Sequence, residues 1–316
     1  MMKNVDDKFP LVSIISINFN NPDVTAEMIE SLRQISYPNF EVIIVDNASV
    51  KGNVDDLKIR FPEIILIKSK KNLGFAGGNN LGITRSKGKY ILLLNNDTIV
   101  DTGFLEPLVF KCVENRNIGA VSPKLYYFQD KNLIQWAGNF PMNFITMRCF
   151  SRGALESEVG KYEADWPSAY NHGAAMLVPR SVIEKVGLMP ECYFLYYEEL
   201  DWGEQIKSKG YSIYYVHNAK VYHKESVSIG ANSQLKIYFM NRGRIIFMRR
   251  NVHGLTFVIA LFYMIFISIP KNLFGFLIKN DFSSAKSYGE AIIWNIKNIC
   301  NRKIHKTRNL SDFTVE

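Results

Sequence analysis

Apolar runs and helix-like segments alternate along the first hundred residues of the chain. Four runs are almost wholly apolar, at residues 12–17, 40–45, 64–67 and 90–94. Such runs are typical of strands that are buried on both faces of a parallel sheet. The segments between them favour helices, at residues 24–35, 54–60 and about 74–86. Strands that alternate with helices predict an α/β fold, with a mostly parallel sheet flanked by helices.

The pattern is less regular after residue 100. We expect a helix at residues 102–116, followed by loops and edge strands over the sheet up to about residue 170. The later elements are expected as a strand at 174–178, a helix at 181–186, a helix within 193–209 and a strand at 212–216. A chain of 316 residues is long enough for one large core, or for one domain with an appendage.

The C-terminal part of the chain is basic and apolar. The net charge is +8, but residues 1–235 are close to neutral, whereas residues 236–316 contain 13 Lys and Arg against four Asp and Glu. Residues 234–250 predict a basic amphipathic helix, and residues 255–270 carry no charge and are rich in Phe, Ile and Leu. This composition favours an anionic membrane surface over a nucleic acid as partner. Residues 234–316 are therefore expected to form a helical appendage that associates with a membrane.

The length of the uncharged run bears on how the appendage meets the membrane. The run is slightly short for a span of roughly 20 residues, and Pro270 interrupts its continuation through residues 273–278. We therefore expect a helical hairpin that lies in the membrane interface rather than a crossing helix. The alternative is that these helices pack on the rest of the chain or on a second subunit in a homodimer.

The cysteines and the N-terminus indicate a cytosolic setting. Four cysteines lie far apart with no Cys-x-x-Cys pair, which favours reduced thiols over a zinc site or a disulfide framework. Residues 1–10 are polar, with two Lys and two Asp, and lack the basic start and apolar stretch of a secretory signal. We expect a cytoplasmic protein, peripheral on the inner face of the cell membrane.

Polar side chains follow successive strands of the predicted sheet. Asn20, Asp46, Asn72 and Asp97 each come just after an apolar run. Ligands bind beyond the carboxyl ends of the strands in an open parallel sheet, so these residues are expected to gather along one binding edge. The alternative for each is a role as a turn former.

A glycine-rich segment at residues 72–80 limits the classes of nucleotide-binding protein that the sequence fits. Alanine stands where the Gly-x-Gly fingerprint of dinucleotide-binding proteins needs its second glycine, and no Gly-Lys-Ser/Thr follows. A nicotinamide enzyme and a P-loop protein are both disfavoured. The segment remains a flexible approach to a helix N-terminus, which either lies beside a nucleotide or permits tight packing.

Two further groups of residues suggest a metal and a base. Asp97, in Asn95-Asn96-Asp97, is a hard oxygen ligand suited to Mg²⁺ or Mn²⁺, and otherwise a helix cap. His223 offers a nitrogen ligand that suits manganese, although a lone histidine is more often structural. Glu198, Glu199 and Asp201 crowd beside aromatic residues, which raises a carboxyl pKa and favours a base near neutral pH over a solvated helix start.

Six stretches of the chain, spread over about residues 11–250, resemble the family 2 glycosyltransferases, particularly the bacterial rhamnosyltransferase-like branch. They occur in the family's order, at residues 12–20, 45–49, 72–79, 93–97, 173–177 and 196–202. Two positions depart from the family pattern. Asn95-Asn96-Asp97 stands where the metal motif is often Asp-x-Asp, and Glu199 stands where the base is usually an aspartate in a Glu-Asp pair.

The resemblance implies a GT-A fold at residues 1–233, with a nucleotide-binding half at about 10–100 and an acceptor half at 101–233. It implies inverting transfer from a nucleoside-diphosphate sugar, such as a dTDP- or UDP-sugar, to a hydroxyl of a glycan or lipid-linked glycan in cell-surface polysaccharide synthesis. The sugar expected first is rhamnose. By the same resemblance, Asp97 holds the metal and Glu199 is the base, with Glu198 or Asp201 as alternatives. Asp46 contacts the pyrimidine nucleoside, and the remaining nucleotide-site residues are Asn20, Asn72, Gly74, Gly78, Asn79 and Asn95.

Two other readings remain open at this stage. A sugar nucleotidyltransferase uses a similar sheet, but it is expected to carry a basic, glycine-rich phosphate loop after the first strand, and residues 18–21 contain none. A non-catalytic module that binds sugar nucleotides at the membrane is compatible with the single carboxylate of Asn95-Asn96-Asp97.

Overall fold

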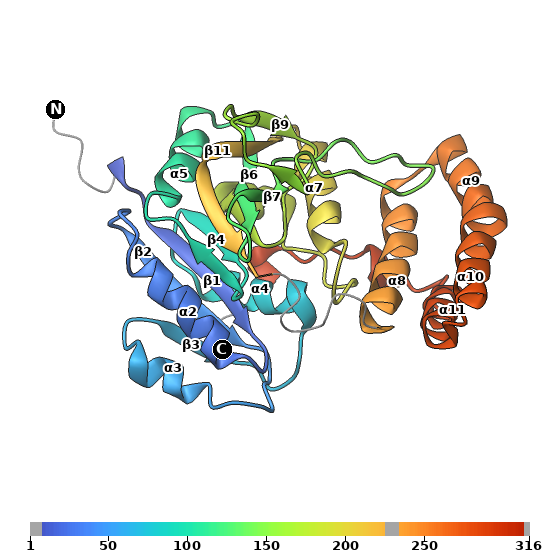
Figure 1. The fold of residues 1–316 in the computed structure, drawn as a ribbon, viewed down its shortest axis with the longest axis horizontal. Coiled ribbons are helices and arrows are strands. Elements are labelled where there is room, and N and C mark those ends of the chain that lie inside the picture. Colours follow the sequence, from blue (N-terminus) through green and yellow to red (C-terminus); the bar gives the residue numbers. More distant parts are fainter. Residues whose placement is uncertain (1–7, 225–233, 313–316) are drawn as a thin grey trace.

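A single mixed sheet organises the molecule, with the strand order β3-β2-β1-β4-β10-β6-β11-β5 (Figure 1). The structure is a computed structural model, and it describes residues 8–224 and 234–312. The first four strands of this order run parallel, so their carboxyl ends meet at one edge. Their bounds are Val12–Asn18 for β1, Phe40–Asp46 for β2, Ile65–Lys68 for β3 and Tyr90–Leu94 for β4. The predicted α/β fold is confirmed.

The second half of the sheet mixes strand directions. Strand β10 runs antiparallel to both β4 and β6, β11 runs parallel to β6, and β5 runs antiparallel to β11. The pairing of β5 with β11 sets His223 opposite Thr98, directly after Asp97. The bounds are Thr98–Val100 for β5, Ile118–Tyr127 for β6, Ala175–Pro179 for β10 and Ser212–His223 for β11. Three short strands pair outside this order, namely β7 (Leu133–Trp136), β8 (Glu156–Ser157) and β9 (Trp166–Ser168).

Strand β6 corrects the expectation of loops and edge strands between residues 116 and 170. It lies inside the sheet, and nine of its ten residues are buried. Gly119, Pro123 and Lys124 interrupt its apolar pattern, which is why the sequence does not reveal it. The buried ammonium group of Lys124 is paired with the carboxylates of Glu158 at 2.8 Å and Glu163 at 2.5 Å, so its charge is compensated.

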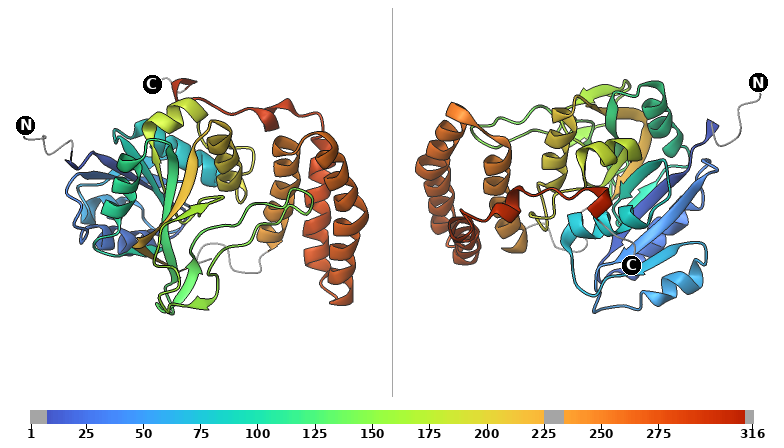
Figure 2. Two further views of the ribbon diagram at one scale, coloured as in Figure 1. Left: turned by 90° about the horizontal axis from the view of Figure 1, so that it is seen from above. Right: turned by 180° about the vertical axis from the view of Figure 1, so that it is seen from behind.

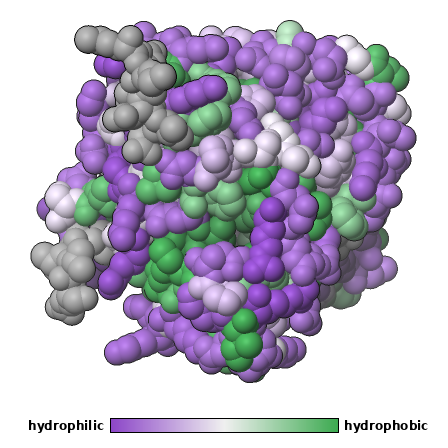
Figure 3. Space-filling view, turned by 90° about the vertical axis from the view of Figure 1, so that its left-hand side faces the viewer, coloured by the Kyte–Doolittle hydropathy of each residue, from purple (hydrophilic) through white to green (hydrophobic). Residues whose placement is uncertain are grey.

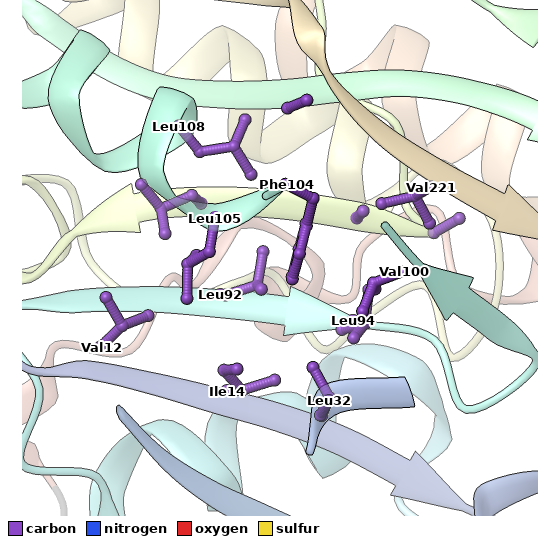
Figure 4. Packing of buried hydrophobic residues seen from close by; sticks show 14 of the residues in the cluster. Val12, Ile14, Leu32, Leu92, Leu94, Val100, Phe104, Leu105, Leu108 and Val221 are labelled. Carbon is purple, nitrogen blue, oxygen red and sulfur yellow. The ribbon is translucent and has the colours of Figure 1, made fainter. Parts of the chain in front are cut away.

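Helices cover both faces of the sheet because successive strand residues point to opposite sides. Ile14 belongs to a core cluster with residues of α2 (Pro22–Leu32), α3 (Asp55–Arg60) and α5 (Leu105–Glu114), and Figure 4 shows Ile14, Leu32 and Leu105 in it. Ile15 belongs to a second cluster on the opposite face. The helices of that face are α4 (Gly74–Arg85), α6 (Arg180–Val186) and α7 (Glu198–Ser208).

The C-terminal helices form a separate block beside the sheet (Figure 2). The block consists of α8 (Gln234–Asn251), α9 (Gly254–Tyr263), a π-helical turn (Met264–Ser268), α10 (Ile269–Ile278) and α11 (Phe282–Lys297). The helix predicted at residues 234–250 is confirmed as α8, but it is not amphipathic, because its apolar and basic residues are spread around the helix. The predicted hairpin at Pro270 is wrong. In the π turn Ile269 N–H donates to Met264 O, and the helix continues through Pro270, which lies in the turn directly after it. The chain reverses only at residues 279–281.

One helix of the block is long and apolar enough to cross a membrane, judged by length and composition among the described residues. It runs from Gly254 to Ile278, its mean hydropathy is 1.9, and only 17% of its most apolar stretch is buried. At 1.5 Å per residue, 25 residues span roughly 37 Å, which exceeds the roughly 30 Å of a bilayer core.

The segment after α11 returns to the sheet domain, where two 3₁₀ turns lie at Arg302–His305 and Leu310–Asp312 (Figure 2). Leu188 N–H donates to Arg308 O at 2.8 Å, and the Arg250 guanidinium donates to Ile304 O. These contacts attach the helical block to the domain. Residues 1–7, which hold most of the N-terminal segment used for the cytosolic expectation, lie outside the described residues.

Candidate active site

A pocket of about 740 Å³ opens beyond the carboxyl ends of β1 and β4. Its volume is in the range that holds small ligands. Eight of the twelve predicted site residues line it, namely Asn72, Gly74, Asn79, Asn95, Asp97, Glu198, Glu199 and His223. The structure therefore brings the predicted metal ligand and the predicted base into one cavity. The other four, Asn20, Asp46, Gly78 and Asp201, lie outside the lining.

Asn47, which the sequence analysis did not single out, organises one wall of the pocket. Its Nδ2 donates to Asn72 Oδ1 at 3.0 Å and to Gly74 O at 3.1 Å, and its Oδ1 accepts from Leu73 N–H at 2.8 Å. The glycine-rich segment is thus fixed at the carboxyl end of β2. Asn47 directly follows Asp46, so its place after a buried strand was the signal for it.

Asp46 and Asn20 hold the neighbouring loop. The Asp46 carboxylate is buried and accepts from Asn18 Nδ2 at 2.9 Å and from Ser49 Oγ at 2.6 Å. The Asn20 side chain accepts from the backbone N–H groups of Val50 and Lys51 at 2.8 and 3.0 Å. Both residues lie near the expected edge, and their contacts support the loop after β2. Their contact with a nucleotide stays a prediction.

Two predicted glycines allow close packing behind the pocket. Gly74 has a φ of +72°, and a Cβ there would lie 2.4 Å from Phe194 O. A Cβ on Gly78 would lie 2.9 Å from Ile17 Cδ1. Gly74 therefore lets α4 approach the loop before α7, and Gly78 lets α4 approach β1.

The loop that precedes α7 is strained. Phe194, Tyr196 and Tyr197 have φ values of 71°, 65° and 75°, in the left-handed region that costs a non-glycine residue about 1–2 kcal/mol. Phe75 N–H holds the loop by donating to Phe194 O at 2.7 Å. Strain of this kind often marks a functional site, because the surrounding structure must maintain it. Here it delivers Glu198 and Glu199 to the pocket.

Burial dominates the electrostatics of these two carboxyl groups. Glu198 is only 3% exposed, and its Oε2 has no hydrogen-bond partner among the described residues. Burial, and then the charge of Glu199, raise the Glu198 pKa well above its usual value. Burial raises the pKa of Glu199 to about 7. A carboxyl group with such a pKa exchanges a proton readily near neutral pH.

Asp97 and His223 form a second polar pair on the pocket wall. Asp97 Oδ1 lies 3.1 Å from His223 Nε2, and His223 Nδ1 lies 2.9 Å from Gln135 Oε1. A proton on Nδ1 satisfies Gln135, which leaves a lone pair on Nε2 toward the carboxylate. Asp97 Oδ1 is buried and has no hydrogen-bond partner among the described residues.

This pair fits a divalent cation. Two neighbouring ligands of an octahedral ion at roughly 2.1 Å lie about 3 Å apart, close to the separation of the two atoms. Among the described residues, no group of three or more His, Cys, Asp and Glu side chains is arranged to hold a metal. Two protein ligands are compatible with Mg²⁺ or Mn²⁺ when substrate phosphates and water supply the others.

Comparison with known proteins decides the family. The model of glycosyl transferase family 2 matches residues 13–187, which is more than half of the chain. The chain belongs to this family. The resemblance first drawn from six sequence stretches is thus confirmed, and it favours glycosyl transfer over the nucleotidyltransferase reading.

The relatives of this chain include bacterial and archaeal proteins. The chain is 26% identical to the O-antigen biosynthesis protein RfbC of Myxococcus xanthus, over 71% of this chain and 18% of that protein. It is 22% identical to the N-acetylglucosaminyl-diphospho-decaprenol L-rhamnosyltransferase of Mycobacterium tuberculosis, over 75% and 84% of the two chains. The match covers 18%, 60% and 25% of three curated relatives, so the chain spans less than two thirds of their length.

Solved structures of the same fold include two that were crystallised with Mn²⁺. GalNAc-T7 with UDP, GalNAc and Mn²⁺ superposes with a TM-score of 0.62 at 14% identity, over 78% of this chain and 48% of that one. The mannosyltransferase PcManGT of Pyrobaculum calidifontis, with GDP-Man and Mn²⁺, gives 0.54 at 14% identity, over 91% and 75%. These likenesses confirm the GT-A fold.

One of the predicted site roles is wrong. Asp201 is 1% exposed and ion-paired with Arg250, and it also accepts from Tyr193 Oη at 2.6 Å and from Gln205 Nε2 at 2.9 Å. It lies outside the pocket and is neutralised by a cation, so it is not placed to act as the base. Its contacts instead join α7 to α8.

The pocket also contains His172, which the sequence analysis missed. Burial, and then the nearby His223, lower the pKa of His172 to about 3, so the ring is neutral. Its Nδ1 accepts from Ala174 N–H at 3.1 Å, which places the ring proton on Nε2. The only signal in the sequence was its position just before the matching stretch at 173–177.

Proposed function

We propose that this glycosyltransferase moves a sugar from a nucleoside-diphosphate donor to a hydroxyl group of a glycan or lipid-linked glycan, with inversion at the anomeric carbon. One observation carries the proposal: the Asp97–His223 pair and the raised-pKa carboxyl group of Glu199 line the same pocket. Transfer from a nucleotide sugar needs the charge of the leaving diphosphate to be neutralised and the attacking hydroxyl of the acceptor to be deprotonated. The pocket offers groups for both tasks.

The residues divide the work as follows. The wall built by Asn47, Asn72 and Asn79 binds the nucleotide part of the donor. Asp97 and His223 hold Mg²⁺ or Mn²⁺, which when bound supplies positive charge against the leaving diphosphate. Glu199 accepts the proton of the acceptor hydroxyl, whose oxygen bonds to the anomeric carbon as the bond to the diphosphate breaks on the opposite face. Glu198 is the alternative base.

A donor screen tests the proposal. Thermal unfolding of the full chain with Mn²⁺ is followed against dTDP-rhamnose first, because of the rhamnosyltransferase relative, and then against other dTDP-, UDP- and GDP-sugars. We expect one class to raise the melting temperature, and the same donor to be hydrolysed slowly. Binding without any hydrolysis or transfer would instead support a non-catalytic module, and no stabilisation by any donor would refute the proposal.

We propose further that the helical block attaches the enzyme to an anionic membrane on the cytoplasmic side. The face of α9 and α10 exposes large apolar side chains, including Leu255 (74%), Phe262 (60%), Phe266 (63%) and Ile278 (65%). The surrounding tail holds 13 basic residues against four acidic ones. The side of the molecule remote from this block is mostly hydrophilic around a smaller apolar centre (Figure 3). Apolar area beside positive charge suits a lipid surface better than a protein partner.

Vesicle binding tests the attachment. The full chain is expected to float with phosphatidylglycerol vesicles and less with phosphatidylcholine vesicles. The double change Phe262→Ser and Phe266→Ser should reduce flotation strongly, whereas Ile59→Ser, at a more exposed apolar residue (77%) of α3, should not. A full chain that ignores both vesicles and sediments as a dimer would show that the face binds a second copy.

A further inference from the structure

The imidazole ring of His172 lines the catalytic pocket and offers it a hydrogen-bond donor. Because Nδ1 accepts from Ala174 N–H at 3.1 Å, it carries no proton, and the ring proton lies on Nε2. Within residues 8–224 and 234–312, no group accepts a hydrogen bond from this Nε2–H. A polar group of a pocket wall that lacks a protein partner is suited to bind a ligand atom of the opposite kind, here an acceptor.

The ring is held in place by the elements around it. The His172 backbone N–H donates to Ser122 Oγ of β6 at 3.2 Å, and the His172 carbonyl accepts from Ala175 N–H of β10 at 3.2 Å. Trp136 of β7 packs edge-on against the ring, with the ring centroids 5.8 Å apart. The direction of Nε2–H is therefore fixed before any ligand binds, which lowers the entropy cost of the contact that it makes.

Residues 172 and 173 bridge the distance between the predicted metal ligands and the predicted base. On one side, the rings of His172 and His223 have centroids 6.1 Å apart and planes at 77°. On the other side, a Cβ on Gly173 would lie 3.9 Å from Glu199 Cδ. In the transfer proposed for this chain, the sugar occupies this interval, because its anomeric carbon bonds to the diphosphate on one face and to the acceptor oxygen on the other. His172 therefore faces the transferred sugar rather than the nucleoside.

We propose that His172 Nε2–H donates a hydrogen bond to a hydroxyl group of the transferred sugar and so helps the enzyme to select its donor. The proposal rests on the proposed function, which supplies the nucleotide sugar and places its diphosphate at Asp97 and His223. A site that donates to a sugar hydroxyl discriminates against a sugar that lacks this hydroxyl, because the buried donor then stays unpaired. An oxygen atom of the diphosphate is the other acceptor within reach of this interval, and the test separates the two.

Two substitutions separate the donor on Nε2 from the rest of the ring. His172→Asn keeps an oxygen near the position of Nδ1, which accepts from Ala174 N–H, and removes the donor, whereas His172→Gln places an amide donor near the position of Nε2. Each full-length chain is titrated by calorimetry in the presence of Mn²⁺. The probes are the nucleotide sugar selected by the donor screen, starting with dTDP-rhamnose, and its nucleoside diphosphate, starting with dTDP. The diphosphate lacks the sugar, so its affinity reports on the metal ligands and the nucleotide wall alone.

His172→Asn is expected to bind the nucleotide sugar roughly tenfold more weakly than wild type, the effect of one neutral hydrogen bond, with unchanged affinity for the nucleoside diphosphate. His172→Gln should recover most of the lost affinity. A loss of affinity for both probes would show that the ring contacts the diphosphate or supports His223, and equal losses in the two variants would show that no donor on Nε2 is used. Either result overturns the inference.

The outcome for wild type distinguishes this inference from the proposed function. A wild-type chain that binds no nucleotide sugar refutes the proposed function itself. A wild-type chain that binds its donor, together with a His172→Asn variant of equal affinity for that donor, refutes only the role of His172.

Discussion

Replacing Glu199 by glutamine gives the sharpest test of the catalytic assignment. The change keeps the shape of the side chain and removes its ability to accept a proton. General-base catalysis contributes about 10²–10⁴-fold to a rate, so turnover of Glu199→Gln is expected to fall by roughly 10² or more. Donor affinity should persist, because the wall formed by Asn47, Asn72 and Asn79 is untouched. The assay is single-turnover transfer, with donor affinity measured by calorimetry.

The pH dependence of the wild-type rate adds a second readout. Burial raises the pKa of Glu199 to about 7, and only the ionised carboxylate accepts a proton. The rate is therefore expected to rise with pH and to level off above pH 8, being about half of its maximum near pH 7 and roughly one tenth near pH 6. Glu199→Gln should lose this dependence.

Glu198 supplies the matched control. Its pKa is raised well above the usual value by burial and by the neighbouring charge, which favours the protonated form that glutamine closely mimics. Glu198→Gln is expected to keep most of its turnover at pH 7. Near-normal turnover in Glu199→Gln would refute the assignment, and a large loss confined to Glu198→Gln would transfer the role to Glu198.

Three further predictions concern the metal, the fold and its pH dependence. Asp97→Ala or His223→Ala each remove one of two protein ligands, so the Mn²⁺ concentration for half-maximal turnover should rise roughly tenfold or more; an unchanged metal titration would exclude the pair. Arg250→Ala removes the cationic partner of the buried Asp201 carboxylate and should lower the free energy of unfolding in urea by about 3–5 kcal/mol. A loss below about 1 kcal/mol would contradict the buried ion pair. The pKa of Glu198 is raised in the folded state, so its contribution to stability is fully present below the unfolded-state pKa and is lost as pH rises. Glu198→Gln should therefore have a higher melting temperature than wild type at pH 8.5 and a similar one at pH 4. Equal differences in melting temperature at the two pH values would contradict this prediction.

The strands that can be predicted from the sequence are the buried strands that are rich in apolar residues. All residues of β4 and four of the seven residues of β1 are apolar, because helices cover both faces of the sheet there. Strand β6 is equally buried, yet it contains Lys124, whose charge is compensated by Glu158 and Glu163 more than thirty residues away. A single sequence does not show which distant carboxylates will meet a buried lysine.

Prediction of the candidate site from the sequence is limited in the same way, because the sequence does not show which distant residues meet. Asp97 and His223 were each predicted as ligands from their chemistry, but only the pairing of β5 with β11 shows that they meet. Asp201 had the same sequence signal as Glu199, and the direction of its side chain separates the two roles. The apolar helix from Gly254 to Ile278 was divided at Pro270 because a proline removes a hydrogen bond, and the π turn before it absorbs that loss.

The helix that opens the appendage also completes the active site. The Arg242 guanidinium donates to Tyr193 O, and Gly243 leaves no space for a side chain against Tyr196 O, where a Cβ would lie 3.1 Å away. Helix α8 therefore packs against the strained loop that presents Glu198 and Glu199, and its own residues line the catalytic pocket. A division of function at residue 234 would cut through one cavity. Attachment of α9 and α10 to a lipid surface would consequently fix the orientation of the pocket relative to that surface, so the attachment and the access of a lipid-linked acceptor to the pocket would depend on the same helices.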